Sequence, residues 1–312
     1  GVVLISRLED RTMSSDLPVP SLDDESIWQY NTYLFDADGV LWKDTEVIPG
    51  ATNFLQKLVE KGKQVFVVTN NATKTVQQYV MKLKNLGFGM ITESNIVCPN
   101  VVMVDFFKRN PHFVSKGIYL IGNEAIKTTM ESNFNVECFG TGPDPMPECP
   151  SFLNYVDIEK KASAVIVSYD PHFSYPKIMK AVNYLRDPNC GFFVTNEDTT
   201  IVMPGCDFLV PESGAMSSVI RAVASPREPT VFGKPCETLA RYLMANFNID
   251  KEQTIMFGDR LDTDIKFGNS NGFATCWMRT GVCSISDVHR AQDGPDPTLV
   301  PQFTYSFEQH CE

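Results

Sequence analysis

Long hydrophobic runs are missing from this sequence of 312 residues. No stretch approaches the roughly 18 consecutive apolar residues that a membrane-spanning helix requires, so we expect no membrane association. The N-terminal segment begins with a short apolar run, but acidic residues follow it and no small-residue cleavage site is present. We therefore expect no signal peptide.

Histidine and paired cysteine are also scarce. The chain has four histidines, and its nine cysteines are scattered without a CxxC motif. Four dispersed histidines provide few ligands for a histidine-rich metal centre. An odd, dispersed set of cysteines predicts free thiols in a reducing compartment, so we expect a cytoplasmic protein.

Positive charge is in deficit, with 27 Lys and Arg against 38 Asp and Glu and a formal net charge of -11. A nucleic-acid-binding protein needs a basic face to neutralise phosphates, so the charge balance argues against a nucleic-acid partner. A small phosphorylated substrate stays compatible with an acidic protein, because a local site can still be positive.

Short apolar runs and amphipathic stretches alternate along the chain, which is 43% apolar overall. The stretches 53–61 and 74–86 repeat apolar residues every three to four positions, as helices do. Strands alternating with helices predict parallel sheets and an α/β fold. The predicted strands are 32–35, 64–68, 117–121, 164–168, 192–195, 230–232, 254–257 and 274–277.

The length of the chain is sufficient for two domains. Residues 141–150 read TGPDPMPECP, a proline-rich loop that can be neither helix nor strand. We place this loop in a second α/β domain inserted at residues 102–204. Residues 30–101 and 205–312 would together form the core domain, and residues 1–29 would be a poorly ordered N-terminal extension.

Polar residues follow four of the predicted strands. In parallel sheets, ligands bind beyond the carboxyl ends of the strands, so these residues are the candidates for chemistry. They are Asp36-Ala37-Asp38-Gly39, Thr69-Asn70-Asn71, Gly233-Lys234, and the run from Asp259 to Asp264.

This inventory of carboxylates, one lysine, one hydroxyl and backbone amides suits phosphoryl transfer from a small molecule. A phosphate ester repels anionic nucleophiles, so a divalent cation must neutralise charge and align the attack. Mg²⁺ prefers oxygen ligands and keeps several waters, so two or three carboxylates suffice to hold it. Asp36 could then attack phosphorus and form an acyl phosphate, while Asp38 protonates the leaving oxygen and later deprotonates water.

The remaining residues of the set would bind the phosphate. Gly39 permits a sharp turn that brings backbone amides close to the anion. Lys234 and the Thr69 hydroxyl would hold the equatorial oxygens. Asn70 and Asn71 open a predicted helix, whose free amides also suit an anion.

Each of these motifs also has a purely structural interpretation. A DxDG tetrapeptide is a common turn, TNN is a common helix N-cap, and Lys234 alone could be a solvated surface residue. The run from Asp259 to Asp264 could merely cap a helix. A calcium loop fails on spacing, because Leu41 and Val47 stand where Gly and Glu are required. The four motifs together, each following an apolar strand, favour the functional interpretation.

In this order, the motifs resemble those of the haloacid dehalogenase superfamily of phosphatases. The segments that carry the resemblance are FDADGVLW, VVTNNATK, YDPHFSY, VTNED, VFGKP and MFGDRLDTDI. They are similar to the subgroup of phosphoglycolate phosphatase, pyridoxal phosphate phosphatase and 4-nitrophenylphosphatase. The resemblance covers roughly residues 30–310 and implies a Rossmann-like parallel-sheet core with an inserted α/β cap.

The resemblance also implies roles for individual residues. Asp36 would be the nucleophile and Asp38 the acid and base. The Asp36 carboxylate, the Asp38 backbone carbonyl and Asp259 would hold Mg²⁺, and Asp264 would support the metal through water or orient Lys234. Thr69, Asn70, Asn71 and Lys234 would bind phosphate. The cap would close over the site and mediate a homodimer.

Substrate choice is less constrained by the resemblance. YDPHFSY and TNED resemble phosphoglycolate phosphatase, whereas the pyridoxal enzymes place a histidine where this chain has Ile201. The first choice is therefore 2-phosphoglycolate, with pyridoxal phosphate or broad 4-nitrophenyl phosphate activity as the alternative. The segment Pro211-Glu212-Ser213-Gly214 departs from the family's PGTG. Glu in place of Gly could reshape this loop, so the resemblance does not predict the loop's contact with the substrate.

Three cap or hinge residues have two interpretations each. His172 could meet a substrate carboxylate or cap the YDPHFSY turn. Asn196 and Asp198 could contact substrate or belong to the hinge between cap and core.

Three rival functions use different chemistry. A haloacid dehalogenase proper needs neither the metal nor Asp38, Asp259 and Asp264. A cysteine phosphatase needs a Cys followed six positions later by Arg, which the sequence lacks. A non-catalytic relative would not need competent residues at every motif position, as this chain has.

Overall fold

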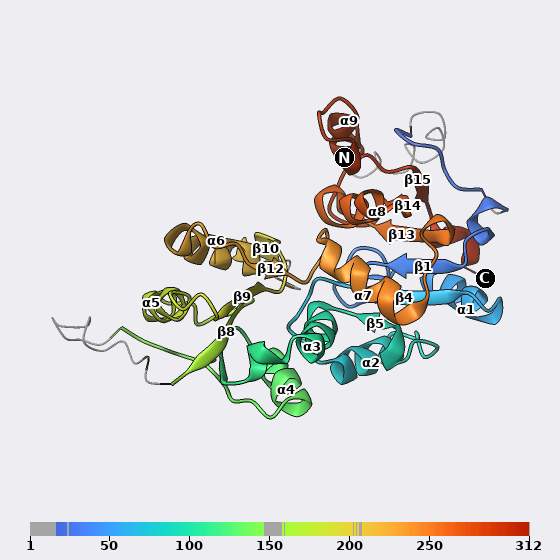
Figure 1. The fold of residues 1–312 in the computed structure, drawn as a ribbon. Coiled ribbons are helices and arrows are strands. Elements are labelled where there is room, and N and C mark those ends of the chain that lie inside the picture. The colour runs from blue at the N-terminus through green and yellow to red at the C-terminus, as the bar shows by residue number, and fades with distance from the viewer. Residues whose placement is uncertain are drawn as a thin grey trace, which may run out of the picture. The chain divides into compact units, whose positions relative to one another are not determined.

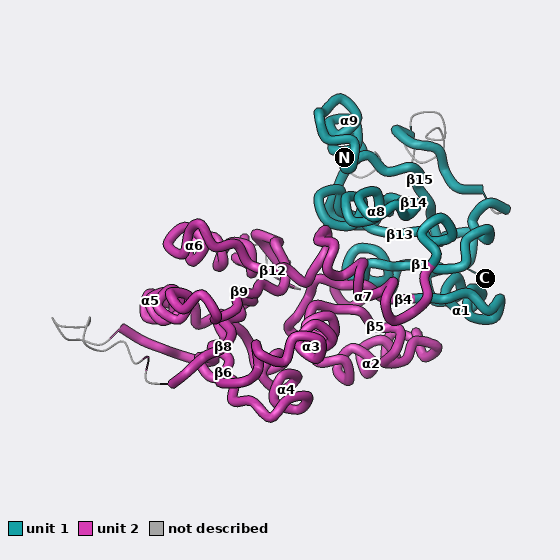
Figure 2. The backbone as a smooth tube through the Cα atoms, viewed as in Figure 1, with its two compact units in different colours: residues 1–43, 47–65, 250–312 teal, residues 44–46, 66–249 magenta. Residues whose placement is uncertain are grey.

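The computed structural model describes residues 17–23, 25–146, 158, 160–201, 203, 205 and 208–311. The chain divides into two compact units, coloured teal and magenta in Figure 2. Unit 1 comprises residues 1–43, 47–65 and 250–312, and unit 2 comprises residues 44–46 and 66–249. The secondary-structure elements carry the labels of Figure 1.

Unit 1 contains parallel strands in the order β15-β14-β13-β1. All residues of β1 and β13 are buried, as expected for strands of a parallel sheet covered on both faces. The strands are β1 (Thr32–Phe35), β13 (Thr254–Gly258), β14 (Ala274–Met278) and β15 (Phe303–Tyr305), and the helices are α1 (Ala51–Glu60), α8 (Lys266–Asn271) and α9 (Ile285–Gln292).

Two groups of side chains form the core of unit 1. One is aromatic: the Phe35 and Phe257 rings stack with centroids 4.8 Å apart, and Phe54 packs against both. The other is built around Trp277, Ile265 and Val288. Together they hold β1 and β13 side by side with Phe35 opposite Phe257.

Part of the predicted N-terminal extension lies within the described residues. Ser21 forms a bridge with Thr304, and Ile27 is fully buried and accepts a hydrogen bond from the Tyr33 hydroxyl at 2.6 Å. The described part of residues 17–29 is therefore packed rather than loose, because its apolar side chains cover unit 1. Residues 1–16 lie outside the described residues.

Unit 2 contains a second parallel sheet with the strand order β12-β9-β8-β6-β7. The strands are β6 (Gly117–Ile121), β7 (Cys138–Phe139), β8 (Ala162–Val167), β9 (Gly191–Val194) and β12 (Thr230–Val231). Strand β12 joins β9 with Thr230 opposite Phe193, so the second sheet continues past residue 204. The boundaries of the inserted domain at 102–204 stay a prediction.

The remaining elements lie mainly in unit 2, except that β2 lies in unit 1. Strand β4 (Gln64–Val68) begins in unit 1 and ends in unit 2. Val67 and Val68 of β4 pair in parallel with β5 (Ile96–Val97). The helices are α2 (Val76–Asn85), α3 (Pro99–Arg109), α4 (Glu124–Asn133), α5 (Tyr175–Tyr184), α6 (Ser213–Ala224) and α7 (Glu237–Phe247). The short strands β2 (Trp42–Lys43) and β3 (Glu46–Val47) follow β1, while β10 (Thr200–Ile201) and β11 (Val210–Pro211) form an antiparallel pair.

Alternation of side chains gives the second sheet two apolar faces. Val165 and Val167 of β8 belong to the core cluster that includes Ala181 of α5 and Ile220 of α6. Phe193 of β9 instead joins a cluster of rings with Phe106, Phe107, Phe113 and Phe232. Helices therefore cover both faces, and the parallel sheets confirm the predicted α/β class.

Most predicted elements match the structure, and one prediction is wrong. Asn70 and Asn71 do not open a helix, because α2 begins only at Val76 and is capped by Thr75, whose hydroxyl accepts a hydrogen bond from Gln78 N. Residues 141–146 contain neither helix nor strand, as predicted, and residues 147–150 lie outside the described residues. Within the described part of the chain, no helix is long and apolar enough to cross a bilayer.

Candidate active site

A cluster of carboxylates lies at the carboxyl ends of β1 and β13 in unit 1. Asp36 follows β1 directly and Asp259 follows β13 directly, and the backbone N–H of Asp36 donates to Phe257 O at 2.8 Å. Among the described residues, Asp36, Asp259 and Asp264 each offer an oxygen within 4.8 Å of the other two. Strand pairing thus brings together carboxylates more than 220 positions apart in the sequence.

Three glycines lie in close contact with the carboxylate cluster. A Cβ atom on Gly281 would lie 1.9 Å from Asp259 Oδ2, and one on Gly258 would lie 2.0 Å from Asp264 Cβ. Gly39 has a φ of +87° and would place a Cβ 2.6 Å from Asp259 Oδ2. Side chains at these glycines would displace the carboxylates, so the glycines shape the cluster.

Hydrogen bonds orient the two buried acids, each 1% exposed. Asp259 Oδ2 accepts from Val282 N at 2.6 Å, and Asp264 Oδ2 accepts from Arg260 N at 3.1 Å. Thr280 Oγ1 donates to Gly39 O at 2.5 Å, which ties the loop after β14 to the turn after β1. The sequence analysis missed this Thr280-Gly281-Val282 loop, although its place after a strand was a signal.

Asp38 lies beside the cluster rather than in it. Its side chain is exposed, and the buried Trp42 indole donates from Nε1 to Asp38 Oδ1 at 2.6 Å. The backbone closes the same turn, because Gly39 N donates to Trp42 O at 2.7 Å. Trp42 therefore fixes the Asp38 carboxylate, a contact that the sequence analysis did not anticipate.

The cluster fits a hard divalent cation. All its donors are carboxylate oxygens, the donor type that Mg²⁺ prefers, and two of the three acids are buried. Carboxylates this close repel one another unless a cation or proton offsets their charge. Asp36, Asp259 and Asp264 are therefore competent ligands, and the predicted participation of the Asp38 carbonyl stays a prediction.

A second cluster forms around Lys234 in unit 2. Lys234 is 1% exposed, and its Nζ donates to Val68 O at 2.6 Å. The Asn70 side chain clamps the Lys234 backbone: Oδ1 accepts from Lys234 N at 2.7 Å and Nδ2 donates to Lys234 O at 2.9 Å. In the described structure Asn70 thus positions the lysine.

Thr69 and Asn71 belong to the same cluster through the loop after β4. Thr69 is 2% exposed, and its Oγ1 accepts from Asn71 N at 3.2 Å, which leaves the hydroxyl proton for another acceptor. Asn71 Oδ1 accepts from Thr73 N at 2.9 Å. Side-chain bonding within the loop therefore replaces the helix N-terminus that the sequence predicted.

Asn196 and Asp198 are tied into this second cluster. Asn196 Nδ2 donates to Asn70 O at 3.0 Å and to Glu212 Oε1 at 3.1 Å, and Asp198 Oδ2 accepts from Asn70 Nδ2 at 3.0 Å. These contacts connect the loop after β9 with the loop after β4 and the start of α6. The choice between a substrate contact and a hinge role for Asn196 and Asp198 stays a prediction.

Glu212, in the segment that departs from the family pattern, is buried at the start of α6. Its Oε1 accepts from Ser213 Oγ at 2.8 Å, whereas its Oε2 has no hydrogen-bond partner among the described residues. Burial raises the pKa of Glu212, and hydrogen bonds from Ser213 and Asn196 oppose this effect. Glu212 therefore joins the hydrogen-bond network of Asn196 and Asn70.

His172 is exposed on the turn before α5. Its backbone N–H donates to Asp170 Oδ1 at 2.8 Å, and Asp170 Oδ2 accepts from Lys177 Nζ at 2.5 Å. Asp170 and Lys177 have fully buried side chains. A buried ion pair thus anchors the turn that carries His172, and the sequence analysis did not identify this pair.

Two family models match the chain. One, described as haloacid dehalogenase-like hydrolase, matches residues 33–133. The other, described as HAD-hydrolase-like, matches residues 231–304. The matched ranges contain Asp36, Asp38 and Thr69 in the first case, and Lys234 and the two buried acids in the second.

Several curated proteins are similar in sequence. Human glycerol-3-phosphate phosphatase is 33% identical over 287 residues, covering 88% of this chain and 87% of that protein. Phosphoglycolate phosphatase 1A, chloroplastic, of Arabidopsis thaliana is 33% identical over 288 residues, covering 90% and 76%. A NipSnap protein of Caenorhabditis elegans is 47% identical over 252 residues and 80% of this chain, which spans about half (48%) of that protein.

Solved structures share the fold. A hypothetical protein from Pyrococcus horikoshii has a TM-score of 0.72 at 27% identity, covering 89% of this chain and 97% of that one. A p-nitrophenyl phosphatase from Archaeoglobus fulgidus has a TM-score of 0.74 at 21% identity, covering 90% and 97%. A Mycobacterium tuberculosis glycerol phosphate phosphatase in complex with magnesium has a TM-score of 0.70 at 22% identity, covering 90% and 76%. With motifs, clusters, family models and relatives in agreement, the chain belongs to the haloacid dehalogenase-like hydrolases, among the phosphatases of that family.

Proposed function

We propose that the chain hydrolyses small phosphate monoesters with Mg²⁺ as cofactor, using Asp36 as the nucleophile. The observation that carries this proposal is the grouping of Asp36 with the buried Asp259 and Asp264, with their oxygens within 4.8 Å of one another. Asp36 is the only member of this group that is partly exposed, so it is the one that can reach a substrate.

The proposed mechanism assigns one task to each group. When bound by Asp36, Asp259 and Asp264 with the Asp38 carbonyl, Mg²⁺ would neutralise charge on the ester and align it for attack. An Asp36 oxygen attacks phosphorus, the bond from phosphorus to the ester oxygen breaks, and Asp38 donates a proton to the leaving alkoxide. Asp38 then takes a proton from water, which attacks the acyl phosphate, releases phosphate and restores Asp36.

The unit 2 cluster would bind the phosphoryl group. Lys234 and the Thr69 hydroxyl are the proposed partners of the phosphate oxygens, because both are buried and fixed by hydrogen bonds. Asn70 holds the Lys234 backbone, and Asn71 holds Thr69 through its amide. Preorganised donors of this kind stabilise charge that develops in the transition state.

Two substrates are supported about equally by similarity. The relatives named for glycerol 3-phosphate and for phosphoglycolate are both 33% identical to this chain. We keep 2-phosphoglycolate as the first choice and test glycerol 3-phosphate beside it, with 4-nitrophenyl phosphate and pyridoxal phosphate as the broader panel. A cytoplasmic location and a homodimer through the inserted domain complete the proposal.

The test is phosphate release from this panel with Mg²⁺, comparing three proteins. Asp36→Asn should lose turnover by several orders of magnitude because the amide is a poor nucleophile. Asp262→Asn is the matched control, since Asp262 lies in the same acidic run but has a side chain that is 66% exposed. EDTA should stop the wild-type reaction and added Mg²⁺ should restore it. Turnover by Asp36→Asn at the wild-type rate would refute the assignment.

A further inference from the structure

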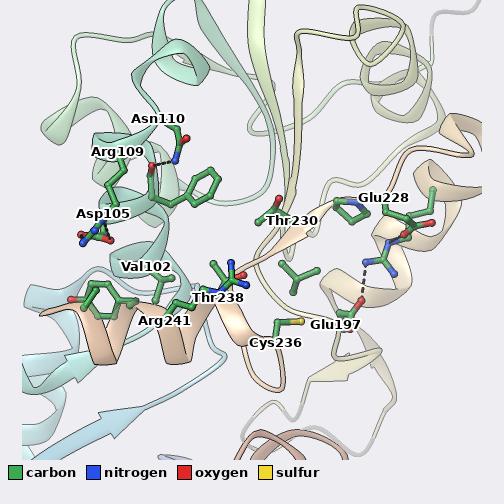
Figure 3. A pocket seen from close by; sticks show the side chains of 16 residues that line it. Val102, Asp105, Arg109, Asn110, Glu197, Glu228, Thr230, Cys236, Thr238 and Arg241 are labelled. Carbon is green, nitrogen blue, oxygen red and sulfur yellow. Dashed lines mark hydrogen bonds and ion pairs between the residues drawn. The ribbon is translucent and has the colours of Figure 1, made fainter. Parts of the chain in front are cut away.

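A cavity of about 760 Å³ lies within unit 2, and none of its lining residues has a place in the proposed catalytic machinery. Its walls come from α3, α7 and the segment around β12, with Arg221 of α6 and Glu197 completing them. Figure 3 shows Asp105 and Arg109 at one side, Glu197 and Glu228 at the other, and Thr238 and Arg241 between them. The volume falls within the roughly 300–1,000 Å³ typical of small-molecule sites.

Three arginines, Arg109, Arg221 and Arg241, line this cavity, and each keeps hydrogen-bond donors available. Arg109 binds Asp105 through Nε and Nη2 at 2.9 and 3.1 Å, and Arg241 binds Glu237 through Nε and Nη2, both at 2.9 Å. Arg221 binds Glu197 through Nη2 at 2.8 Å. In the described part of the chain, Nη1 of each arginine donates no hydrogen bond.

Arg221 has a second donor without an acceptor. Its Nε is buried and makes no hydrogen bond to any described residue, and Glu228 Oε2 lies 3.8 Å from it, beyond hydrogen-bond distance. A buried donor without an acceptor is destabilising, and a hydrogen bond from a charged donor is stronger than one between neutral groups. A ligand oxygen at this position would satisfy the orphaned group.

The walls combine three arginines with the carboxylates of Asp105, Glu197 and Glu228, so an organic anion would compete with these carboxylates for the guanidinium groups. Guanidinium forks match the oxygens of a phosphate group, while Val102, Phe106 and Val231 offer apolar surface to a carbon skeleton. The ion pairs of Arg109 and Arg241 are partly or largely solvent-exposed, and exposed ion pairs are weak, so a dianion can compete with them. We propose that this cavity is a binding site for a small organic phosphate, distinct from the catalytic centre.

The position of the cavity couples it to Lys234. Thr230 and Val231 precede Lys234 by a few residues, and Cys236 and Thr238 follow it, so both flanking segments line the cavity. Glu197 lies between Asn196 and Asp198, whose bonds reach the Asn70 clamp. A bound ligand would therefore contact the segments that flank Lys234. The role of Lys234 rests on the proposed function, whereas the binding site does not.

Binding is tested with phenylphosphonate, whose carbon–phosphorus bond a phosphomonoesterase does not hydrolyse. Calorimetric titration should show that Arg221→Gln and Arg241→Gln each weaken binding about tenfold or more, the loss expected for one charge-assisted hydrogen bond. Arg290→Gln is the matched control: Arg290 is 74% exposed and pairs with Asp287 on α9, in unit 1. Both cavity variants should keep wild-type circular dichroism and basal turnover.

Cys236 supplies a readout of location, since it lines the cavity and is half-buried. Phenylphosphonate should slow alkylation of Cys236 by iodoacetamide, measured by peptide mass spectrometry, and leave the exposed Cys311 unaffected. Unchanged Cys236 alkylation, or cavity variants that bind like Arg290→Gln, would overturn the proposal.

A Lys234→Met variant separates this proposal from the proposed function. It should lose turnover and any phenylphosphonate binding at the catalytic centre, while Cys236 protection persists. Full turnover by Lys234→Met would refute the role of Lys234 in catalysis and leave the cavity site standing.

Discussion

Replacing Asn70 by alanine removes the side chain that clamps Lys234. The amide makes three hydrogen bonds: it accepts from Lys234 N at 2.7 Å, and donates to Lys234 O at 2.9 Å and to Asp198 Oδ2 at 3.0 Å. Two bonds to neutral groups at about 1 kcal/mol each and one to a carboxylate at about 2 kcal/mol give a loss of about 4 kcal/mol in the free energy of unfolding.

The assay is urea denaturation followed by far-ultraviolet circular dichroism. Trp28, Trp42 and Trp277 all lie in unit 1 whereas Asn70 lies in unit 2, so circular dichroism, which reports on the helices of both units, is the better probe. With a slope of about 2–3 kcal/mol per molar urea, the midpoint of the affected transition should fall by roughly 1–2 M. Turnover should fall as well, because the Lys234 backbone loses its fixed position.

Asn246→Ala is the control for this experiment. Asn246 is exposed on α7 and donates one hydrogen bond, to Tyr242 O at 2.9 Å, so its loss should change the midpoint little. If Asn70→Ala unfolded at the same urea concentration as Asn246→Ala, the clamp would contribute nothing, and the account of how Lys234 is positioned would be refuted.

Three further changes test other parts of the account. Gly281→Ala places a Cβ 1.9 Å from Asp259 Oδ2, so the Mg²⁺ concentration for half-maximal activity should rise about tenfold or more; an unchanged metal titration would contradict the packing argument. Trp42→Phe removes the 2.6 Å bond to Asp38 Oδ1 and should lower kcat about tenfold at unchanged KM; steady-state kinetics with an unchanged kcat would exclude a positioning role. Burial raises the pKa of Glu212 above its ordinary 4.5, so its stabilising contribution is complete below pH 4.5 and is lost as the pH rises through the folded-state pKa. The urea midpoint of Glu212→Gln should not show this fall between pH 4 and about 8. Midpoints that change with pH in the same way in both proteins would contradict the prediction.

The strands were predictable because their composition is local. TYLF and QVFVV are short apolar runs, and the structure buries nearly every residue of both at β1 and β4. Placement of Asp36 and Asp259 beyond strand ends followed from the same logic, since parallel strands end at one edge of a sheet. The parallel pairing of β1 with β13 then accounts for their proximity.

The contacts that position the site were not predictable, because they join residues far apart in sequence. Val282 N binds Asp259, Asn70 clamps Lys234, and neither contact has a local pattern. Local side-chain bonding also overrode one expectation. With the Asx turn at Asn71 and the cap at Thr75, α2 begins at Val76, within the predicted helical stretch 74–86, so Asn70 and Asn71 precede the helix instead of opening it.

Glu212 illustrates a different limit of the sequence. Glu212 was noticed in the sequence because it departs from a family pattern. Its burial at 3% exposure and its hydrogen bonds with Asn196 and Ser213 could not be predicted, because they depend on the tertiary structure. The same holds for Lys177, whose fully buried side chain pairs with Asp170. A charged residue in an amphipathic helix normally reads as exposed.

The central claim, that Asp36 becomes phosphorylated during turnover, can be measured directly. Wild-type protein turning over its best ester with Mg²⁺ is quenched in acid and treated with borohydride, which reduces an acyl phosphate to an alcohol. Peptide mass spectrometry should then find homoserine in place of Asp36, and no such change without substrate or in Asp36→Asn protein. Turnover that leaves Asp36 unmodified, or modification at another carboxylate, would contradict the account.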